Sequence, residues 1–449
     1  MEVLKASVSG IRGIVGESLT PEVVVNYTAA FAAWLGPGAV AVGRDTRISG
    51  PLYQRLVEGT LAAAGIDVVD IGIVPTPTLL LYVREKGLAG GLLVTASHNP
   101  VEWNALKLVK AGGAFLEQDD FDALSRLLEQ PKRYTLAPGI GAFSRDQDAV
   151  SLQADLLLSN YDANAIRKNA FKVAFDPGNG AGAVMDRLFL GRLNCELVSV
   201  NESVTGHFSR PPEPGPDTLG GLAWLVQKSG AAVGFAQDPD ADRLCLVDER
   251  GVPLSEELTL ALCLLAYYKK GGKGNVVVNM STSRVNDDVA ARFGASVSRS
   301  KVGEANVLGE MRRLQAPIGG EGNGGIIYPA LNPCRDSFVG MLLLLDLLAM
   351  EGRPLSEIAG GLPLYFMEKI KLPVGGKVDY RGALVQAFRS AGEGPMELNE
   401  LDGLRFDFEA GWVHLRESNT EPVVRLIAES RDRKRMQRWV ESAQQVIGC

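Results

Sequence analysis

Short apolar runs of the kind that form strands alternate with stretches of helical character through most of the chain. In the first part, the expected strands are residues 39–43, 68–71 and 91–95, and the expected helices are 52–64 and 78–85. This strand–helix–strand rhythm predicts a mostly parallel sheet with helices on both faces.

The same rhythm starts twice more along the chain. A second group has expected strands at 171–176, 232–237 and 244–248, and a third has strands at 275–279 and 316–319 with a helix near 284–293. Three α/β domains of roughly 100–150 residues each are therefore predicted. Their similarity lies in architecture, because no repeated sequence is visible.

The last part of the chain follows a different pattern. Expected strands at 366–372, 404–409, 411–415 and 423–430 precede a helix at 433–447, whose apolar residues recur at helical spacing. The fold class is therefore α/β, with three similar domains on parallel or mixed sheets and a smaller α+β domain at the C-terminus. Expected linkers near 143–148, 248–253 and 360–364 divide the chain into domains 1–147, 148–250, 251–363 and 364–449.

Composition narrows the classes of function. The 449 residues carry a net charge of −7 without a long Lys/Arg run, which argues against a nucleic-acid partner. The longest apolar runs, such as 341–350, are too short to span a bilayer, and the start of the chain lacks a signal-peptide pattern. Five cysteines without CxxC spacing are expected to be reduced thiols. We therefore expect a cytoplasmic protein without a membrane partner, as a monomer or a homodimer.

The segment TASHNP at residues 95–100 places a serine directly after an apolar strand. Ligands of open α/β sheets bind at this end of the strands, and Ser97 could carry a phosphoryl group there, given a metal and a base. The alternative is a helix N-cap. His98 could act as a base or order the loop, and Lys107 could move a proton, neutralise phosphate charge or lie on the surface.

The segment DPDADR at residues 238–243 follows another apolar run. Asp238, Asp240 and Asp242 alternate, so an extended loop points all three carboxylates the same way, where they repel one another unless a cation binds. Oxygen ligands suit Mg²⁺ or Ca²⁺, and because the loop lacks the EF-hand pattern, Mg²⁺ is preferred over Ca²⁺. The alternative to a metal site is a solvated acidic turn. Arg243 is expected beside the metal and could touch a phosphoryl group.

Two later loops contain groups that recognise polar ligands. Residues 319–325 are rich in glycine and offer Glu321 and Asn323, an acid and an amide that would suit sugar hydroxyls; the alternative is a flexible surface loop. Residues 416–422, with Arg425 beyond them, gather hydroxyl, amide and guanidinium donors that suit a phosphate dianion. The alternative here is the capped start of a helix. Arg12, in a Gly/Arg turn, could be a second phosphate contact.

Taken in order, these segments resemble the α-D-phosphohexomutase superfamily over essentially the whole chain. TASHNP is similar to its phosphoserine loop, DPDADRL at 238–244 to its Mg²⁺ loop, GEGNGG at 320–325 to its sugar loop, and RESNTEP at 416–422 to its phosphate loop. The resemblance implies four domains around one central cleft. It also implies one Mg²⁺ per chain, bound by phospho-Ser97 and the three aspartates, and hexose 1,6-bisphosphate as activator. The non-reacting phosphate is implied to bind a set of five residues: Arg416, Ser418, Asn419, Thr420 and Arg425.

The resemblance also implies the reaction. Phospho-Ser97 passes its phosphoryl group to a hexose phosphate, and the 1,6-bisphosphate turns over and returns the other phosphoryl group to the serine. The sugar and phosphate loops are similar to the phosphoglucosamine mutase subgroup, so the expected reaction converts glucosamine 6-phosphate to glucosamine 1-phosphate. Asn419 also occurs in phosphomannomutases, so a phosphomannomutase/phosphoglucomutase stays open, as do a metal-dependent phosphohydrolase and an inactive sugar-phosphate binding protein. Asn323, Gly325 and Glu304 stand where relatives carry Ser or His.

Overall fold

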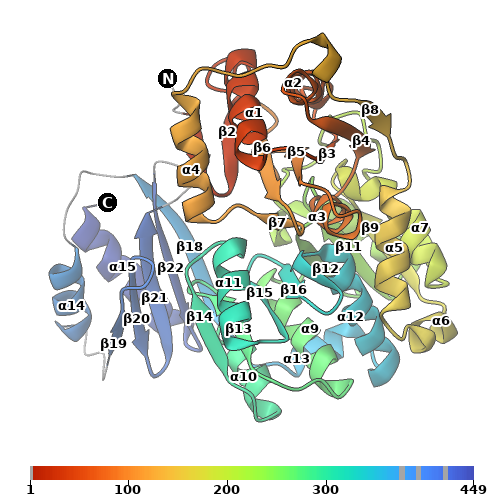
Figure 1. Ribbon diagram of the computed structural model, residues 1–449. Coiled ribbons are helices and arrows are strands. Elements are labelled where there is room, and N and C mark those ends of the chain that lie inside the picture. The colour runs from red at the N-terminus through yellow and green to blue at the C-terminus, as the bar shows by residue number, and fades with distance from the viewer. Residues whose placement is uncertain (1–3, 374–379, 391–395, 418–422, 449) are drawn as a thin grey trace. The chain divides into compact units, whose positions relative to one another are not determined.

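The computed structural model describes residues 4–373, 380–390, 396–417 and 423–448 (Figure 1). The chain forms two compact units, one of residues 1–269 with 323–359 and one of residues 270–322 with 360–449. Among the described residues, no helix is long and apolar enough to cross a membrane.

The first unit begins with a mixed sheet in the strand order β1-β2-β6-β5-β3-β4-β8, with β7 paired to β6. Its strands are β1 (Lys5–Ser7), β2 (Gly10–Ile14), β3 (Ala39–Arg44), β4 (Asp67–Ile73), β5 (Gly90–Val94), β6 (Trp103–Lys110), β7 (Ala114–Phe115) and β8 (Phe143–Arg145). Its helices are α1 (Pro21–Leu35), α2 (Gly50–Ala63), α3 (Thr76–Glu85) and α4 (Gln118–Leu128). Strands β3, β4, β5 and β8 pair in parallel, and β6 runs antiparallel to β5.

A second sheet in this unit has the order β10-β9-β11-β12, with only β12 antiparallel. This part of the chain contains α5 (Ala149–Ser159), α6 (Asn164–Asn169), β9 (Lys172–Asp176), α7 (Asp186–Arg192), β10 (Glu196–Ser199), α8 (Gly220–Ser229), β11 (Val233–Gln237), β12 (Leu244–Val247) and α9 (Glu257–Lys269). Three short 3-10 turns lie at Ala137–Gly139, Ala181–Val184 and Pro216–Thr218. The unit ends with β16 (Gly325–Tyr328), β17 (Asn332–Arg335), α12 (Ser337–Glu351) and α13 (Leu355–Gly360).

Helices α9 and α12 explain why part of the sequence shows no amphipathic period. They pack against each other, and nearly every side chain in the middle of each helix is buried. A helix that is buried on all sides needs no polar stripe, so its sequence is a continuous apolar run. The carboxylate of Asp336 caps the start of α12 by accepting from the backbone N–H groups of Phe338 and Val339.

The second unit combines an α/β part with the C-terminal sheet. Strands β14, β13 and β15 pair in parallel, and the C-terminal strands pair antiparallel in the order β18-β22-β21-β20-β19. The elements are β13 (Val276–Asn279), α10 (Val285–Arg292), β14 (Val297–Ser300), α11 (Glu304–Leu314), β15 (Ile318–Glu321), β18 (Phe366–Pro373), α14 (Arg381–Ser390), β19 (Glu397–Asn399), β20 (Leu404–Phe408), β21 (Gly411–Glu417), β22 (Val423–Ser430) and α15 (Arg433–Ile447). Phe388 of α14 and Trp439 of α15 pack into one apolar core with the sheet.

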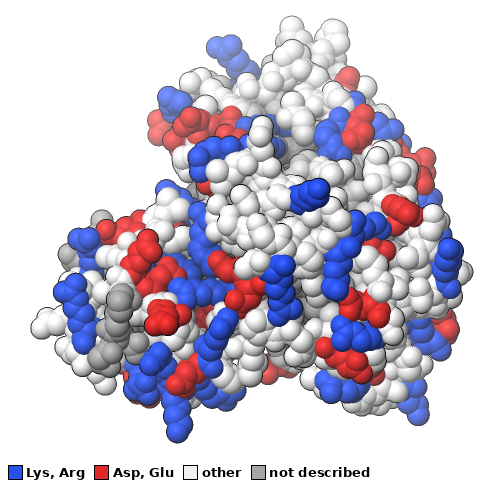
Figure 2. Space-filling view, turned by 90° about the horizontal axis from the view of Figure 1, so that it is seen from below, with Lys and Arg blue, Asp and Glu red and all other residues white. Residues whose placement is uncertain are grey.

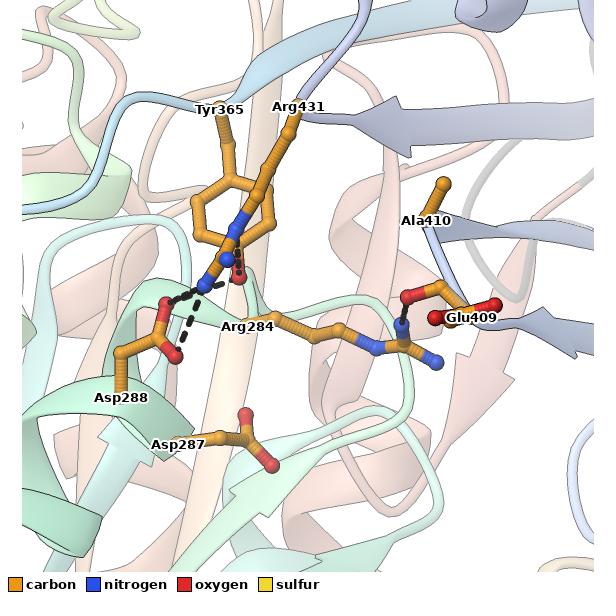
Figure 3. A pocket seen from close by; sticks show the side chains of 7 residues that line it. All are labelled: Arg284, Asp287, Asp288, Tyr365, Glu409, Ala410 and Arg431. Atoms are coloured by element: carbon orange, nitrogen blue, oxygen red, sulfur yellow. Dashed lines mark hydrogen bonds and ion pairs between the residues drawn. The ribbon is translucent and has the colours of Figure 1, made fainter.

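Ion pairs join the two parts of the second unit (Figure 3). Arg284, at the start of α10, donates to the backbone carbonyl of Phe408 and to the carboxylate of Asp407, both at 2.8 Å. Arg431 after β22 donates to both carboxylate oxygens of Asp288, at 2.8 and 3.0 Å. Arg284, Asp288 and Arg431 border a polar cavity of about 220 Å³, and both arginines are already paired with carboxylates or carbonyls.

The elements expected from the sequence are present, with small shifts at their ends. One expectation is wrong: residues 143–145 are not linker but the edge strand β8, which pairs in parallel with β4. A short exposed strand has no buried face and therefore no hydrophobic pattern. On the described residues of the face drawn in Figure 2, acidic and basic side chains are interspersed, in keeping with the modest net charge.

Candidate active site

Ser97 lies in a tight loop just beyond the end of β5. Its φ of 50° is in the left-handed region, which a residue with a Cβ adopts only at a cost in energy. The Thr95 hydroxyl accepts from the Ser97 N–H at 3.0 Å and donates to Asp45 at 2.6 Å, which fixes this conformation. No helix follows, so the N-cap interpretation of Ser97 is wrong.

One buried guanidinium, that of Arg47, holds the serine loop in place. Arg47 donates to four backbone carbonyls of the loop and of the segment after it, at 2.6–2.9 Å, and these belong to Ser97, Asn99, Pro100 and Trp103. Its Nε donates to the buried carboxylate of Asp45. All of the donor capacity of Arg47 therefore goes into shaping the loop.

Arg47→Lys should lower kcat/KM by about 100-fold, because a lysine ammonium cannot reach four carbonyls in this fork geometry and the serine would lose its fixed position. Steady-state kinetics test this, with the exposed Arg55→Lys as the matched control. A fully active Arg47→Lys enzyme would show that the loop keeps its shape without the guanidinium.

The acidic loop connects β11 to β12. Asp238, Asp240 and Asp242 are fully buried, and Ala241 between the last two has a φ of 56°, a second strained residue that is not glycine. One oxygen from each carboxylate lies within 4.8 Å of the others. The solvated acidic turn considered from the sequence is therefore wrong, since a solvated turn would expose its carboxylates.

The two loops meet. The Ser97 hydroxyl donates to Oδ2 of Asp238 at 2.8 Å, although the residues are 141 positions apart in the chain. A hydroxyl that could carry a phosphoryl group thus lies against three buried carboxylates.

Four cationic side chains surround this acidic group. Lys107 on β6 pairs with Asp240 at 2.5 Å, and Arg335 at the end of β17 pairs with Asp242 at 2.5 Å. Arg243 lies 3.6 Å from Asp242, and Arg12 on β2 donates to Asn99 of the serine loop at 2.8 Å. The interpretation of Lys107 as a surface lysine is wrong, because it faces inward from a strand with only 5% of its side chain exposed.

Burial and charge act on these carboxylates in opposite directions. Burial, together with the neighbouring Asp240 and Asp242, raises the pKa of Asp238 well above its ordinary value. Burial also tends to raise the pKa of Asp240, but the charge of Lys107 and hydrogen bonds from Asp238, Lys107 and Thr76 together outweigh it, so the pKa of Asp240 is lowered. Burial lowers the pKa of Arg12 to about 10, which leaves it cationic at neutral pH.

The donor set fits a hard divalent cation. Oδ1 of Asp240 and Oδ1 of Asp242 are buried and accept no hydrogen bond within the described part of the chain. A buried carboxylate oxygen without a donor is costly unless a cation binds it, and oxygen ligands suit Mg²⁺. Asp238, Asp240 and Asp242 could therefore hold a metal ion.

Glu213 is a residue of this site that the sequence did not reveal. One of its oxygens accepts from Arg243 at 2.5 Å, and the other lies 3.5 Å from Nε2 of His98. The opposite ring nitrogen of His98, Nδ1, lies 3.4 Å from the Ser97 hydroxyl. Burial, followed by Arg243, lowers the pKa of His98, so the imidazole is neutral at neutral pH. Glu213 thus orients a neutral imidazole beside the serine.

The glycine-rich loop runs from one unit into the other along the chain. In the second unit, Glu321 is buried, and its Oε1 accepts from the amide of Asn279 at 2.8 Å and from the Gly303 N–H at 2.9 Å. In the first unit, Asn323 is half-buried and accepts from the Gly325 N–H at 3.1 Å. These contacts order both side chains, so the flexible-loop interpretation is wrong.

Two arginines lie side by side in the C-terminal sheet. Strand register places Arg416 of β21 directly opposite Arg425 of β22. Like charges in this position repel, and burial together with Arg425 lowers the pKa of Arg416, against the opposing effect of Asp402. Such a pair is typical of an anion-binding site. Arg416 lies in strand β21, whereas Ser418, Asn419 and Thr420 lie outside the described residues, and so does the alternative of a helix capped by Ser418 or Thr420.

His414 of β21 gives the second unit a pH dependence. Burial lowers its pKa to about 4, so the folded protein binds fewer protons than the unfolded chain between about pH 4 and pH 6.5. The His414 contribution to stability is therefore present above this window and is lost as pH falls through it. We expect wild type to lose about 2 kcal/mol more stability than His414→Gln between about pH 7 and pH 4.5. Urea unfolding at both pH values tests this, and equal losses would contradict it.

Comparison with known proteins gives the family. Four models of the phosphoglucomutase/phosphomannomutase family match in order: α/β/α domain I at residues 4–135, domain II at 154–251, domain III at 256–365 and the C-terminal domain at 370–445. The chain belongs to the phosphoglucomutase/phosphomannomutase family. The predicted layout of three α/β domains and a C-terminal domain is confirmed, while the boundaries given above stay predictions. As a member of this family the chain is a phosphohexomutase, an isomerase that transfers a phosphoryl group within its substrate.

Two relatives match over nearly their whole length. A protein of Methanopyrus kandleri named "probable phosphoglucosamine mutase" is 35% identical over 95% of this chain and 94% of its own. A "phosphoglucomutase/phosphomannomutase" of Thermococcus kodakarensis is 33% identical over 96% of both chains.

Solved structures show the same fold. A phosphoglucomutase/phosphomannomutase family protein from Burkholderia thailandensis superposes with a TM-score of 0.84 at 26% identity, over 99% of this chain and 96% of its own. The N-acetylphosphoglucosamine mutase of Aspergillus fumigatus, solved with GlcNAc-6P and magnesium, gives a TM-score of 0.63 at 15% identity, over 100% of this chain and 95% of its own.

Proposed function

We propose that this phosphohexomutase interconverts glucosamine 6-phosphate and glucosamine 1-phosphate through phospho-Ser97 and a 1,6-bisphosphate intermediate. The observation that carries the proposal is the placement of the strained Ser97 hydroxyl 2.8 Å from a buried group of three aspartates. The choice of sugar rests on the Methanopyrus kandleri relative and on the GEGNGG and RESNTEP segments.

We propose Mg²⁺ as the metal, one per chain, held by Asp238, Asp240, Asp242 and the phosphoryl oxygen on Ser97. When bound, Mg²⁺ would neutralise part of the phosphoserine charge and polarise the phosphoryl oxygens. The open carboxylate oxygens described above support this choice, as does the magnesium found in the Aspergillus fumigatus mutase.

The phosphoryl transfer uses side chains around Ser97. A substrate hydroxyl oxygen forms a bond to phosphorus, and the bond between phosphorus and Oγ breaks with its electron pair on Oγ. The proton released by the substrate hydroxyl is the one that Oγ takes up, and Nδ1 of the neutral His98, 3.4 Å from Oγ, is placed to carry it between the two oxygens. Lys107, Arg12 and Arg243 face the same region and would stabilise the charge of the transferring group.

The rest of the substrate is assigned to the other two loops. Arg416 and Arg425 are proposed to bind the phosphate that does not react, together with Ser418, Asn419 and Thr420. Glu321 and Asn323 are proposed to form hydrogen bonds with the sugar hydroxyls. The 1,6-bisphosphate would act as activator, because it rephosphorylates Ser97 when an intermediate escapes.

Kinetics with three substrates test the sugar assignment. We would measure kcat/KM with Mg²⁺ and a trace of hexose 1,6-bisphosphate for glucosamine, mannose and glucose 6-phosphates side by side. A preference of about ten-fold for glucosamine phosphate corresponds to one hydrogen bond of discrimination and would support the proposal.

The second candidate is a phosphomannomutase/phosphoglucomutase. The Thermococcus kodakarensis relative with that name and Asn419 in the phosphate loop favour it. A ten-fold preference for mannose or glucose phosphate in the same assay would select it over the glucosamine assignment.

A further inference from the structure

One turn of the C-terminal sheet lies directly on Arg416. Asp402 and Gly403 connect β19 to β20, and Gly403 has a φ of 84°. A Cβ at Gly403 would lie 2.4 Å from the carbonyl oxygen of Leu415 and 2.8 Å from Cβ of Arg416, so only glycine allows this close approach. The turn therefore packs directly against the backbone of Arg416.

Asp402 contacts more than the arginine. Its Oδ2 lies 3.9 Å from Nη1 of Arg416 and also accepts from the N–H of Val302 at 2.8 Å. Its backbone carbonyl accepts from Nε2 of His414 at 2.6 Å, so Nδ1 of that neutral histidine accepts from the hydroxyl of Ser281. The same aspartate thus joins the phosphate-binding arginine to the segment before α11.

The next residue of that segment holds the sugar-loop glutamate. The N–H of Gly303 donates to Oε1 of Glu321 at 2.9 Å. Glu321 also accepts from the side-chain amide of Asn279, whose Oδ1 accepts from the N–H of Ser281 at 2.8 Å. Two neighbouring backbone N–H groups therefore bind the two carboxylates: that of Val302 donates to Asp402, and that of Gly303 donates to Glu321.

We propose that Asp402 is a positioning residue that couples the binding of the non-reacting phosphate at Arg416 to the recognition of the sugar by Glu321. A phosphate that draws the Arg416 guanidinium toward itself weakens the Arg416–Asp402 pair. The carboxylate of Asp402 and the Val302 N–H bound to it then shift together, and the adjacent Gly303 N–H shifts with them against Glu321. The inference rests on the roles proposed above for Arg416 and Glu321.

A double-mutant cycle tests the coupling. We expect Asp402→Ala to raise KM by about 10-fold with kcat changed less than about three-fold, and Glu321→Gln to lower kcat/KM by about 100-fold. Because the two residues act through one segment, the double variant should lose about 100-fold rather than the 1,000-fold product. Glu400→Gln, an exposed residue in the same connection that pairs with Arg381, should behave as wild type.

The possible outcomes separate this inference from the proposed function. Losses that multiply in the double variant would overturn the coupling while leaving the mutase assignment intact. A wild-type chain without turnover of any hexose phosphate would overturn the proposed function instead. If Asp402→Ala fails to fold, Asp402→Asn replaces it in the cycle, since an amide still accepts from Val302 but carries no charge toward Arg416.

Discussion

Replacing Ser97 with alanine should lower kcat by at least about 10,000-fold, because the hydroxyl that carries the phosphoryl group is lost and the three aspartates cannot replace it. Folding should be unaffected. The backbone conformation of the loop is set by Arg47 and by Thr95, and neither contact uses the serine hydroxyl. The measurement is single-turnover and steady-state kinetics, with the melting temperature as a check on folding.

The matched control is Ser125→Ala, which removes a serine hydroxyl that donates to the helix carbonyl of Phe121 in α4. That variant should keep wild-type kinetics. A Ser97→Ala enzyme that retains even one-tenth of wild-type kcat would contradict the phosphoserine mechanism.

Replacing Asp240 with asparagine should reduce kcat/KM by about 100-fold or more and remove the stabilisation by Mg²⁺. Asp240 offers a buried oxygen without a hydrogen-bond donor among the described residues, and its other oxygen is held by Lys107 and Thr76 at 2.5 Å. An amide has the same shape but not the charge that binds the cation.

Two measurements separate metal binding from loss of structure. Wild type should show a higher melting temperature with Mg²⁺ than with a chelator, since a ligand that binds only the folded state stabilises it. Asp240→Asn should show no such difference, and the exposed Asp217→Asn should respond as wild type. An unchanged Mg²⁺ response in Asp240→Asn would mean that the acidic loop is structural.

The main loops of the candidate site could be predicted because each follows an apolar strand and contains reactive or charged side chains that a turn does not need for its conformation. Ser97 and the three aspartates are of this kind, and the strands before them, β5 and β11, lie where the hydrophobic pattern placed them. Nothing local shows that Ser97 meets Asp238, because that contact depends on how two sheets of the first unit pack.

Residues that act through long-range contacts could not be predicted. Glu213 lies in a proline-rich stretch without helical or strand periodicity, and Arg335 ends an ordinary short strand. Arg47 belongs to a short Gly/Arg turn at residues 43–47 that indicates no role by itself, yet its guanidinium holds the whole serine loop. Lys107 was open to a surface interpretation because β6 is buried on both faces and so shows no alternation.

Direct observation of the phosphoryl group on Ser97 tests the phosphoserine mechanism. The chain would be incubated with hexose 1,6-bisphosphate and Mg²⁺, and peptide mass spectrometry would locate any added phosphoryl group before and after glucosamine 6-phosphate is supplied. We expect one phosphoryl group on Ser97, which is lost to the sugar as the 1,6-bisphosphate forms. Phosphorylation elsewhere, or a phosphoserine that the sugar phosphate does not discharge, would contradict it.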